Sequence, residues 1–186
     1  HFVDDSARAA AAQLHIDRTR ELVRRLEASG MRAECLVGGG TFSFPYYAKA
    51  EGFLGSPGTA VYWDYNYGTA LEQMPFRWAA LILTQVVDIH IGTGSVTTDL
   101  GIKAVCGDPI LECRARLLGH QQARLVLQNE EHGVFRWPGD LPEVGTYLLA
   151  VPGHVCSTTI RYPGSFVLDD EGQVVDYYPH TARDRQ

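Results

Sequence analysis

The sequence is poor in lysine, contains no long apolar run and has no closely spaced cysteine pair, and each shortage excludes a class of protein. Only two of its 16 basic residues are lysines, and the net charge of −6 disfavours nucleic acid and anionic membranes as partners. No uncharged apolar run reaches the roughly 18 residues of a membrane-spanning helix. The four cysteines form no CxxC motif, which excludes a zinc ribbon and a thioredoxin motif. We therefore expect a cytoplasmic protein with reduced cysteines.

The remaining composition is that of a folded protein. Apolar residues make up 45% and charged residues 20% of 186 residues, enough to bury a sizeable core. The length is too short for a complete eight-fold βα barrel, which needs about 250 residues. The sequence opens on His1 as though a preceding strand were missing, which indicates a processed or truncated piece of a longer product.

The order of periodic segments predicts an α/β part followed by an all-β part. Apolar residues spaced three and four apart predict an amphipathic helix over residues 5–29, and a short buried strand follows over 33–37. Strand character returns at 59–63 and 78–91. Beyond residue 95, short strands recur at intervals of roughly ten residues between turn residues, which indicates an antiparallel sheet or barrel. We place the boundary between the two parts at residue 90.

A glycine-rich loop follows the first predicted strand and comprises Gly38, Gly39, Gly40 and Thr41. Glycines let the backbone approach a ligand closely, their N–H groups can converge on phosphate oxygens, and the threonine hydroxyl adds a donor. The loop contains neither GxGxxG nor GK[ST], so it matches no nucleotide fingerprint. A tight strand exit without a ligand is the alternative interpretation.

A second candidate site is the pair His154 and Cys156, which follows a predicted strand. If the backbone stays extended, residues two apart point to the same side, so an imidazole and a sulfur would face one cavity. Zinc accepts both ligand types, and two protein ligands leave coordination positions open, as in a catalytic site. The alternative is a buried cysteine beside a hydrogen-bonded histidine.

Three weaker candidates remain open between a functional and a structural interpretation. His132 follows two glutamates and is either a proton carrier or part of an exposed turn. The aromatic stretch 62–68, with Asp64 inside it, either lines a cofactor ring or packs in the core. Asp99 and Lys103 are the last candidates, and Lys103 is either a solvated side chain or an imine-forming residue.

The order and separation of six segments resemble the carboxyl-terminal half of the D-threonine aldolase and D-serine dehydratase-like family. These are alanine-racemase-like, fold type III enzymes that use pyridoxal phosphate. The segments are GGGTFSFPYY, SPGTAVYWDYNYG, TTDLGIKAV, NEEHG, VPGHVCSTT and VVDYYPHTARDR. The resemblance covers essentially the whole chain. It implies the carboxyl-terminal part of a βα barrel over residues 1–90 and an antiparallel β-domain over 91–186; recruitment of the extreme carboxyl terminus to the barrel is left open.

The resemblance also implies roles for particular residues. It assigns the cofactor phosphate to Gly38, Gly39, Gly40 and Thr41, a divalent metal such as zinc or manganese to His154 and Cys156, and substrate binding or proton transfer to His132. The family's cofactor lysine belongs to an amino-terminal half that this sequence does not contain. Neither Lys49 nor Lys103 is therefore assigned to it, and we expect the chain alone to be incomplete and to expose apolar surface.

The implied activity is a metal-assisted lyase that cleaves D-3-hydroxy amino acids to glycine and an aldehyde. Pyridoxal phosphate supplies an electron sink, and the metal would act as a Lewis acid on the substrate hydroxyl. Dehydration of D-serine or 3-hydroxyaspartate is the alternative within enzymes, and a non-catalytic homologue that binds metal or a partner chain is the alternative outside them. The resemblance implies a homodimer of the complete protein with a small D-amino acid substrate.

Overall fold

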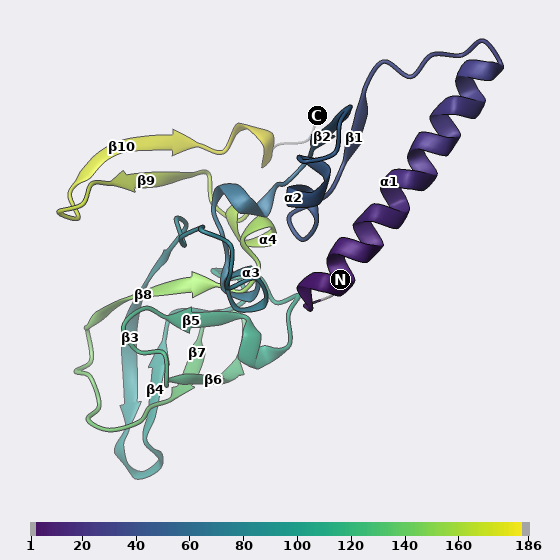
Figure 1. The fold of residues 1–186 in the computed structure, drawn as a ribbon. Helices are drawn as coiled ribbons and strands as arrows, with labels where there is room; N and C mark the ends of the chain where they lie inside the picture. The colour runs from purple at the N-terminus through teal and green to yellow at the C-terminus, as the bar shows by residue number, and fades with distance from the viewer. Residues whose placement is uncertain (1–2, 184–186) are drawn as a thin grey trace. The chain divides into compact units, whose positions relative to one another are not determined.

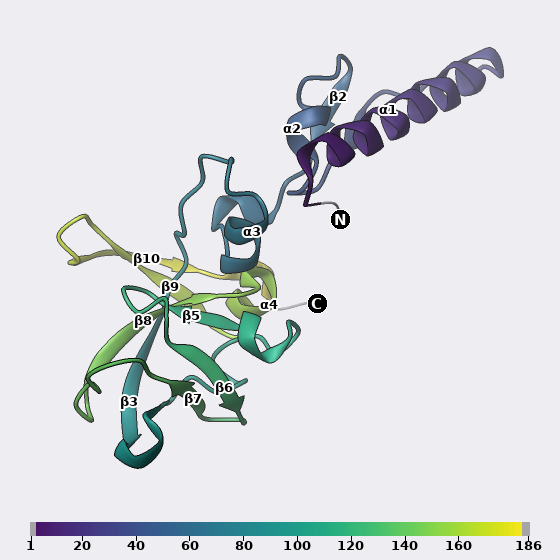
Figure 2. The same cartoon turned by 60° about the horizontal axis from the view of Figure 1, so that its bottom comes forward.

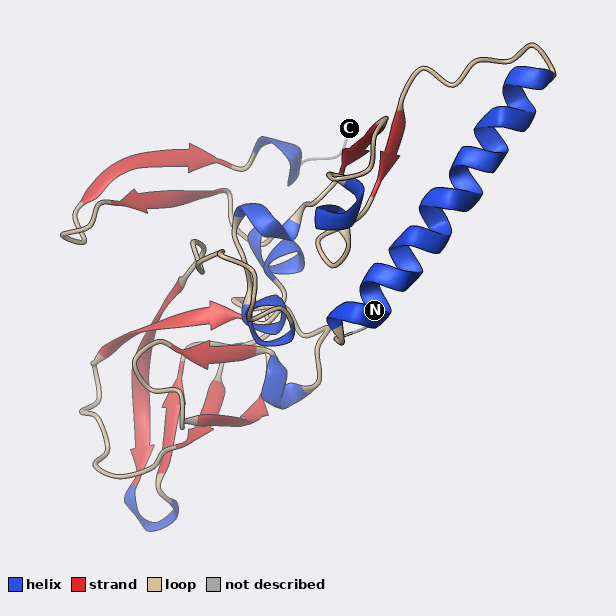
Figure 3. Cartoon of the chain, viewed as in Figure 1, coloured by secondary structure: helices blue, strands red, loops and turns tan. Residues whose placement is uncertain are grey.

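A computed structural model describes residues 3–183, which divide into two compact units. Within these residues, one unit comprises residues 3–61 and Tyr67–Phe76, and the other comprises Tyr62–Asn66 and residues 77–183. The predicted boundary at residue 90 differs from this division. The strand predicted over 78–91 was assigned to the α/β part, whereas the structure places these residues in the second unit. Figure 3 shows helix concentrated in the first unit and strand in the second.

The first unit is built on one long helix. It contains α1 (Asp5–Ala28), β1 (Leu36–Gly38), α2 (Phe44–Tyr47), β2 (Phe53–Gly55), the 3₁₀ turn η1 (Thr59–Val61) and the last four residues of α3 (Tyr65–Ala70). The helix predicted over 5–29 is confirmed. The Asp4 carboxylate accepts a hydrogen bond from the Ala7 N–H and caps the helix start. Gly30, at φ +83°, turns the chain away at its end.

The strands of this unit differ from prediction in position and kind. β1 begins three residues later than the strand predicted over 33–37, and it pairs in parallel with β2. The strand predicted over 59–63 is wrong. The Val61 N–H donates to the Gly58 carbonyl, and this bond between residues three apart closes a 3₁₀ turn directly after Pro57.

The second unit is an antiparallel sheet of six strands in the order β5-β8-β3-β4-β7-β6 (Figure 1). The strands are β3 (Ile82–His90), β4 (Ser95–Thr98), β5 (Ala115–Leu117), β6 (Arg124–Gln128), β7 (Gly133–Arg136) and β8 (Tyr147–Pro152). The edge strands β5 and β6 also approach each other, so the sheet curls into a nearly closed barrel (Figure 2). The predicted fold class, α/β followed by antiparallel β, is confirmed.

Side-chain alternation places the core inside this curled sheet. On β3, Ile82, Thr84 and Val86 are buried while Leu83 and Val87 are exposed. Across the sheet the interior is filled by apolar side chains, chiefly Val96, Leu100, Leu117, Leu125, Phe135 and Ala150. Short connecting elements complete the sheet: η2 (Ile91–Thr93), η3 (Leu111–Cys113) and α4 (Val155–Thr159).

A hairpin of β9 (Gly164–Leu168) and β10 (Val174–Pro179) follows α4, and η4 (Thr181–Arg183) follows β10. All six residues of β10 are exposed. Phe166 and Tyr177 pack on each other across the hairpin, with ring centroids 5.2 Å apart, yet both remain accessible. The hairpin therefore displays apolar surface. Within residues 3–183 no helix is both long and apolar enough to cross a membrane.

Candidate functional site

The candidate site lies where β8 gives way to α4. His154 is the last residue before the helix and has an extended backbone, with φ −139° and ψ 101°. The helix begins at Val155, so Cys156 lies on its first turn and not on a continuing strand. The expectation of an extended 154–156 segment is therefore wrong. At the start of the helix, the Val155 N–H donates to a side-chain acceptor from another loop, the carboxylate of Asp64, which satisfies one of the free N–H groups of the first turn.

The His154 ring is held by two groups from different segments. Its Nδ1 lies 3.0 Å from Oδ2 of Asp108 and 3.2 Å from the Ser157 hydroxyl oxygen. The Ser157 hydroxyl donates to the same carboxylate oxygen at 2.7 Å. This hydrogen bond, followed by interactions with Cys106 and His154, lowers the pKa of Asp108. Asp108 is therefore an ionised acceptor near neutral pH.

Cys106 completes a group of three side chains that could bind a metal. One ligand atom each from Cys106, Asp108 and His154 lie within 4.8 Å of one another. Cys106 is buried, its sulfur accepts the Asp108 N–H at 3.4 Å, and burial raises the pKa of its thiol. Nitrogen, oxygen and sulfur donors together suit a borderline-soft cation such as zinc. Cys156 is exposed and does not belong to this group, and its predicted role as a ligand stays a prediction.

Asp64 fixes the backbone directly behind His154. Its side chain is 1% exposed, and Oδ2 accepts the Val155 N–H at 3.1 Å. Its carbonyl accepts the indole N–H of Trp78 at 3.2 Å. The preceding residue, Trp63, is also buried and has φ +54°, which is unusual for a residue with a side chain. The aromatic stretch 62–66 thus packs within the second unit and supplies a buried carboxylate to the site.

Replacement of Asp64 with alanine is expected to destabilise the second unit by about 1–3 kcal/mol, because it leaves a buried N–H without its acceptor. The free energy of urea-induced unfolding measures this loss. Asp64→Asn keeps an oxygen in the same place and is the matched control, with a smaller expected loss. Equal stability of the alanine variant and the wild type would contradict this role.

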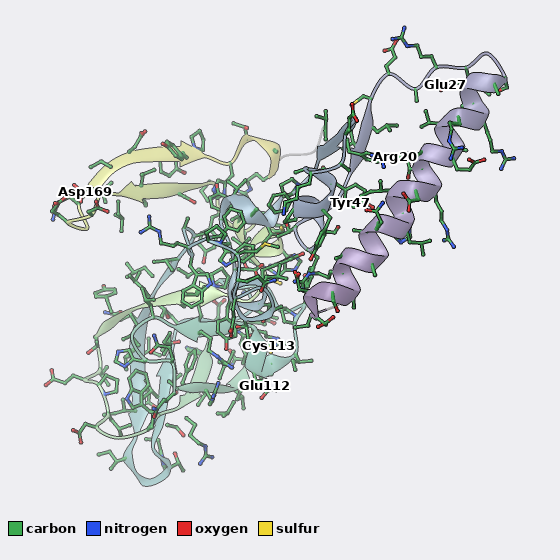
Figure 4. All side chains as sticks on the ribbon, viewed as in Figure 1. Arg20, Glu27, Tyr47, Glu112, Cys113 and Asp169 are labelled. Carbon is green, nitrogen blue, oxygen red and sulfur yellow. The ribbon has the colours of Figure 1, made fainter. Side chains whose placement is uncertain are left out.

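The glycine loop lies in the first unit, where packing accounts for two of its glycines. A Cβ on Gly38 or Gly39 would lie 2.5 or 2.6 Å from the ring of Tyr47, which Figure 4 labels. Gly39 also has φ +76°, a conformation that favours glycine. A Cβ on Gly40 would meet nothing within 4 Å, and Thr41 is 4% exposed. The open space beside Gly40 is compatible with a phosphate, and the phosphate assignment stays a prediction.

The other sequence candidates lie on the β6–β7 turn and beside it. His132 is exposed in this turn, where its backbone N–H donates to the Asn129 side chain at 2.7 Å. The Lys103 amine forms ion pairs with Glu130 and Glu131, at 3.2 and 2.5 Å. Hydrogen bonding to these glutamates raises the pKa of Lys103. Lys103 is thus engaged in surface ion pairs, and the proton-transfer role of His132 stays a prediction.

Asp99, the remaining candidate, joins two strands. Its carboxylate accepts the Thr84 hydroxyl at 2.5 Å and the Gln85 N–H at 2.8 Å. Both donors lie on β3, and Asp99 directly follows β4. The carboxylate therefore has a structural role in the pairing of these strands.

Comparison with known proteins shows what this chain is similar to. Residues 79–168 match the sequence family described as "Putative serine dehydratase domain". The chain is 29% identical over 191 residues to 3-hydroxy-D-aspartate aldolase of Paracoccus denitrificans, covering 98% of this chain and 47% of the relative. It is 30% identical over 171 residues to D-threonine aldolase of an Arthrobacter species, covering 85% and 42%.

Two solved structures share its fold. The crystal structure of D-threonine aldolase from Filomicrobium marinum matches with a TM-score of 0.84 and 24% identity, over 96% of this chain and 49% of that one. D-threo-3-hydroxyaspartate dehydratase from Delftia sp. HT23 matches with a TM-score of 0.76 and 19% identity, over 94% and 51%. In sequence and in fold, the chain resembles the D-threonine aldolase and D-serine dehydratase-like family of fold type III enzymes. It spans about half the length of the relatives that it matches.

Proposed function

We propose that the protein is a metal-assisted, pyridoxal-phosphate-dependent lyase that cleaves D-3-hydroxy amino acids to glycine and an aldehyde. The observation that supports this most is the match of 85–98% of the chain to relatives named as D-threonine aldolase and 3-hydroxy-D-aspartate aldolase. The site fits that chemistry because His154 offers a 38% exposed imidazole beside an ionised carboxylate. In such a reaction the hydroxyl proton leaves, the Cα–Cβ bond breaks, and the electron pair remains on Cα until it is protonated.

Residues of this chain would hold both cofactors. Gly38, Gly39, Gly40 and Thr41 would receive the phosphate of pyridoxal phosphate, since Gly40 leaves open space beside the loop. His154 would bind the divalent metal, with Cys156 as its second protein ligand. Two further solved structures that share the fold are variants of D-threo-3-hydroxyaspartate dehydratase, in which a histidine and a cysteine two positions apart are changed to alanine, and the cysteine variant is described in the metal-free form. When bound, the metal would stabilise negative charge on the substrate hydroxyl oxygen.

Dehydration is the second candidate, and the structural match to D-threo-3-hydroxyaspartate dehydratase favours it. It removes the proton from Cα and breaks the Cβ–O bond, leaving the Cα–Cβ bond intact, so the hydroxyl and a proton leave as water. Hydrolysis of the resulting enamine or imine then gives a 2-oxo acid and ammonia. Both reactions need the same hydroxyl to be bound beside the metal. The products therefore distinguish the two activities where the residues do not.

The test is a product assay on the protein expressed from its full reading frame. With pyridoxal phosphate and Mn²⁺ or Zn²⁺, D-threonine and D-3-hydroxyaspartate are supplied separately, and glycine, aldehyde, ammonia and 2-oxo acid are measured. Glycine from either substrate in equal amount to aldehyde supports the aldolase. Ammonia with a 2-oxo acid supports the dehydratase instead. The absence of both sets of products would identify a non-catalytic homologue.

We also propose that the complete protein is a cytoplasmic homodimer.

A further inference from the structure

The hydrogen bonds around His154 determine which ring nitrogen carries the proton. Oδ2 of Asp108 faces both His154 Nδ1 and the Ser157 hydroxyl, and an aspartate carboxylate near neutral pH can only accept hydrogen bonds. The Ser157 hydroxyl donates its single hydrogen to that same oxygen, so toward His154 it can also only accept. Two acceptors therefore face Nδ1, at 3.0 and 3.2 Å. In the neutral ring Nδ1 must carry the hydrogen, and Nε2 keeps its lone pair.

The other nitrogen is left available. Within residues 3–183 no protein group is hydrogen-bonded to Nε2, and the side chain is 38% exposed. A neutral imidazole binds a metal through an unprotonated nitrogen. The contacts thus select the tautomer in which Nε2 is ready to act as a ligand.

Hydrogen bonds that do not involve the Asp108 carboxylate connect the turn that bears Asp108 to α4. The Cys106 N–H donates to the Thr158 hydroxyl oxygen at 3.2 Å, and that hydroxyl donates to the His154 carbonyl at 2.8 Å. Cys106 and Thr158 are buried, so these bonds are shielded from water. The turn that bears Asp108 is therefore fixed relative to His154.

We infer that Asp108 is a positioning residue that orients His154 and selects its Nε2 as the metal-binding atom. Ser157 assists by occupying the same carboxylate oxygen. This inference rests on the proposed metal role of His154 and adds to it a residue outside the ligand pair. A carboxylate that accepts the second N–H of a metal-binding histidine commonly strengthens metal binding 10–100-fold. Direct ligation of the metal by Asp108 is the competing arrangement that the experiments below distinguish.

The first experiment measures the tautomer without metal in the full chain. Long-range ¹H–¹⁵N spectra at about pH 8, above the usual histidine pKa of about 6.5, report which nitrogen of His154 is protonated. Nδ1–H is expected in the wild type and in Asp140→Ala, which removes an exposed carboxylate elsewhere in the same unit. A mixture of tautomers is expected in Asp108→Ala. A wild-type spectrum with Nε2 protonated, or one unchanged in Asp108→Ala, would overturn the inference.

The second experiment measures Co²⁺ affinity and the visible spectrum of the bound ion. Asp108→Ala is expected to bind Co²⁺ 10–100-fold more weakly with an unchanged band shape, because the ligand set is the same. Asp108→Asn retains an oxygen acceptor and should recover part of the loss, which a general folding defect would not show. Unchanged affinity in the alanine variant, or a band shape that reports a lost ligand, would overturn the positioning role.

Failure of the proposed function gives a different pattern. Normal Co²⁺ binding without any lyase product contradicts the activity but leaves the role of Asp108 intact. A wild-type protein that binds no Co²⁺ overturns the metal role of His154 and the positioning role together.

Discussion

His154→Ala is expected to abolish metal-dependent release of aldehyde from D-threonine while pyridoxal phosphate stays bound. The substitution removes the proposed ligand itself, so the loss of metal affinity should exceed the roughly 100-fold upper range for changes to residues behind a ligand. The cofactor phosphate is assigned to a loop more than a hundred residues away in the sequence, so its retention is expected. Aldehyde release, metal content and the absorbance of bound pyridoxal phosphate are measured on the same preparation.

Two controls separate the loss of a ligand from damage to the fold. His154→Asn can still donate from its side-chain amide to Asp108 but has no equivalent of Nε2, so it should lose metal as fully as the alanine variant. His90→Ala removes an exposed histidine that bonds to Thr93 and should change neither readout. Full activity in His154→Ala would remove the metal role assigned to this residue.

Gly153→Ala is expected to destabilise the second unit by about 3 kcal/mol, at the upper end of the range for overpacking. A Cβ on this glycine would lie 1.8 Å from the carbonyl oxygen of Cys113, a residue labelled in Figure 4. The neighbour is backbone, so no side-chain rotation relieves the clash. The Gly153 N–H also donates to the Arg114 carbonyl at 2.7 Å, which holds the two segments together. Urea-induced unfolding measures the loss.

The same substitution should weaken metal binding, because the displaced residue directly precedes His154. Gly92→Ala is the matched control, since its Cβ would first meet only the end of an exposed histidine side chain, at 3.4 Å. It is expected to change the unfolding free energy by less than about 0.5 kcal/mol. Similar losses in both variants would contradict the assigned importance of the close approach at Gly153.

The fold was predictable wherever local signals agreed with one another. Residues 5–29 combined helical periodicity with a cap and a terminal glycine, and they form α1. The strands β4, β6 and β8 to β10 lie beyond residue 94, in the region where turn-separated apolar segments predicted short strands. β5 was missed because Ala115–Leu117 is only three residues long, with a charged residue at its centre that is buried in the structure. β7 was missed because it begins at once after the turn that contains His132.

The site was only partly predictable, because its contacts join segments distant in sequence. His154 was identified from its spacing to Cys156, yet that spacing depended on an extended backbone that the structure does not have. Asp108 lies 46 residues from His154, and no periodic pattern links them. Asp64 was noted only as a carboxylate within an aromatic stretch. The only local signal for the turn that bears Asp108 was the succession of a cysteine, a glycine and an aspartate at residues 106–108.

The path of the chain limits how the molecule can be dissected. Residues 62–66 belong to the β-rich unit although the segments on both sides belong to the helical one, so the polypeptide changes unit three times. No single cleavage point yields both parts intact. A fragment trimmed to the family match at residues 79–168 would omit Asp64, and α4 would start without its acceptor. If such a fragment fails to bind metal, the loss of residues 62–66 is therefore the first explanation, and the result says nothing yet about the metal ligands.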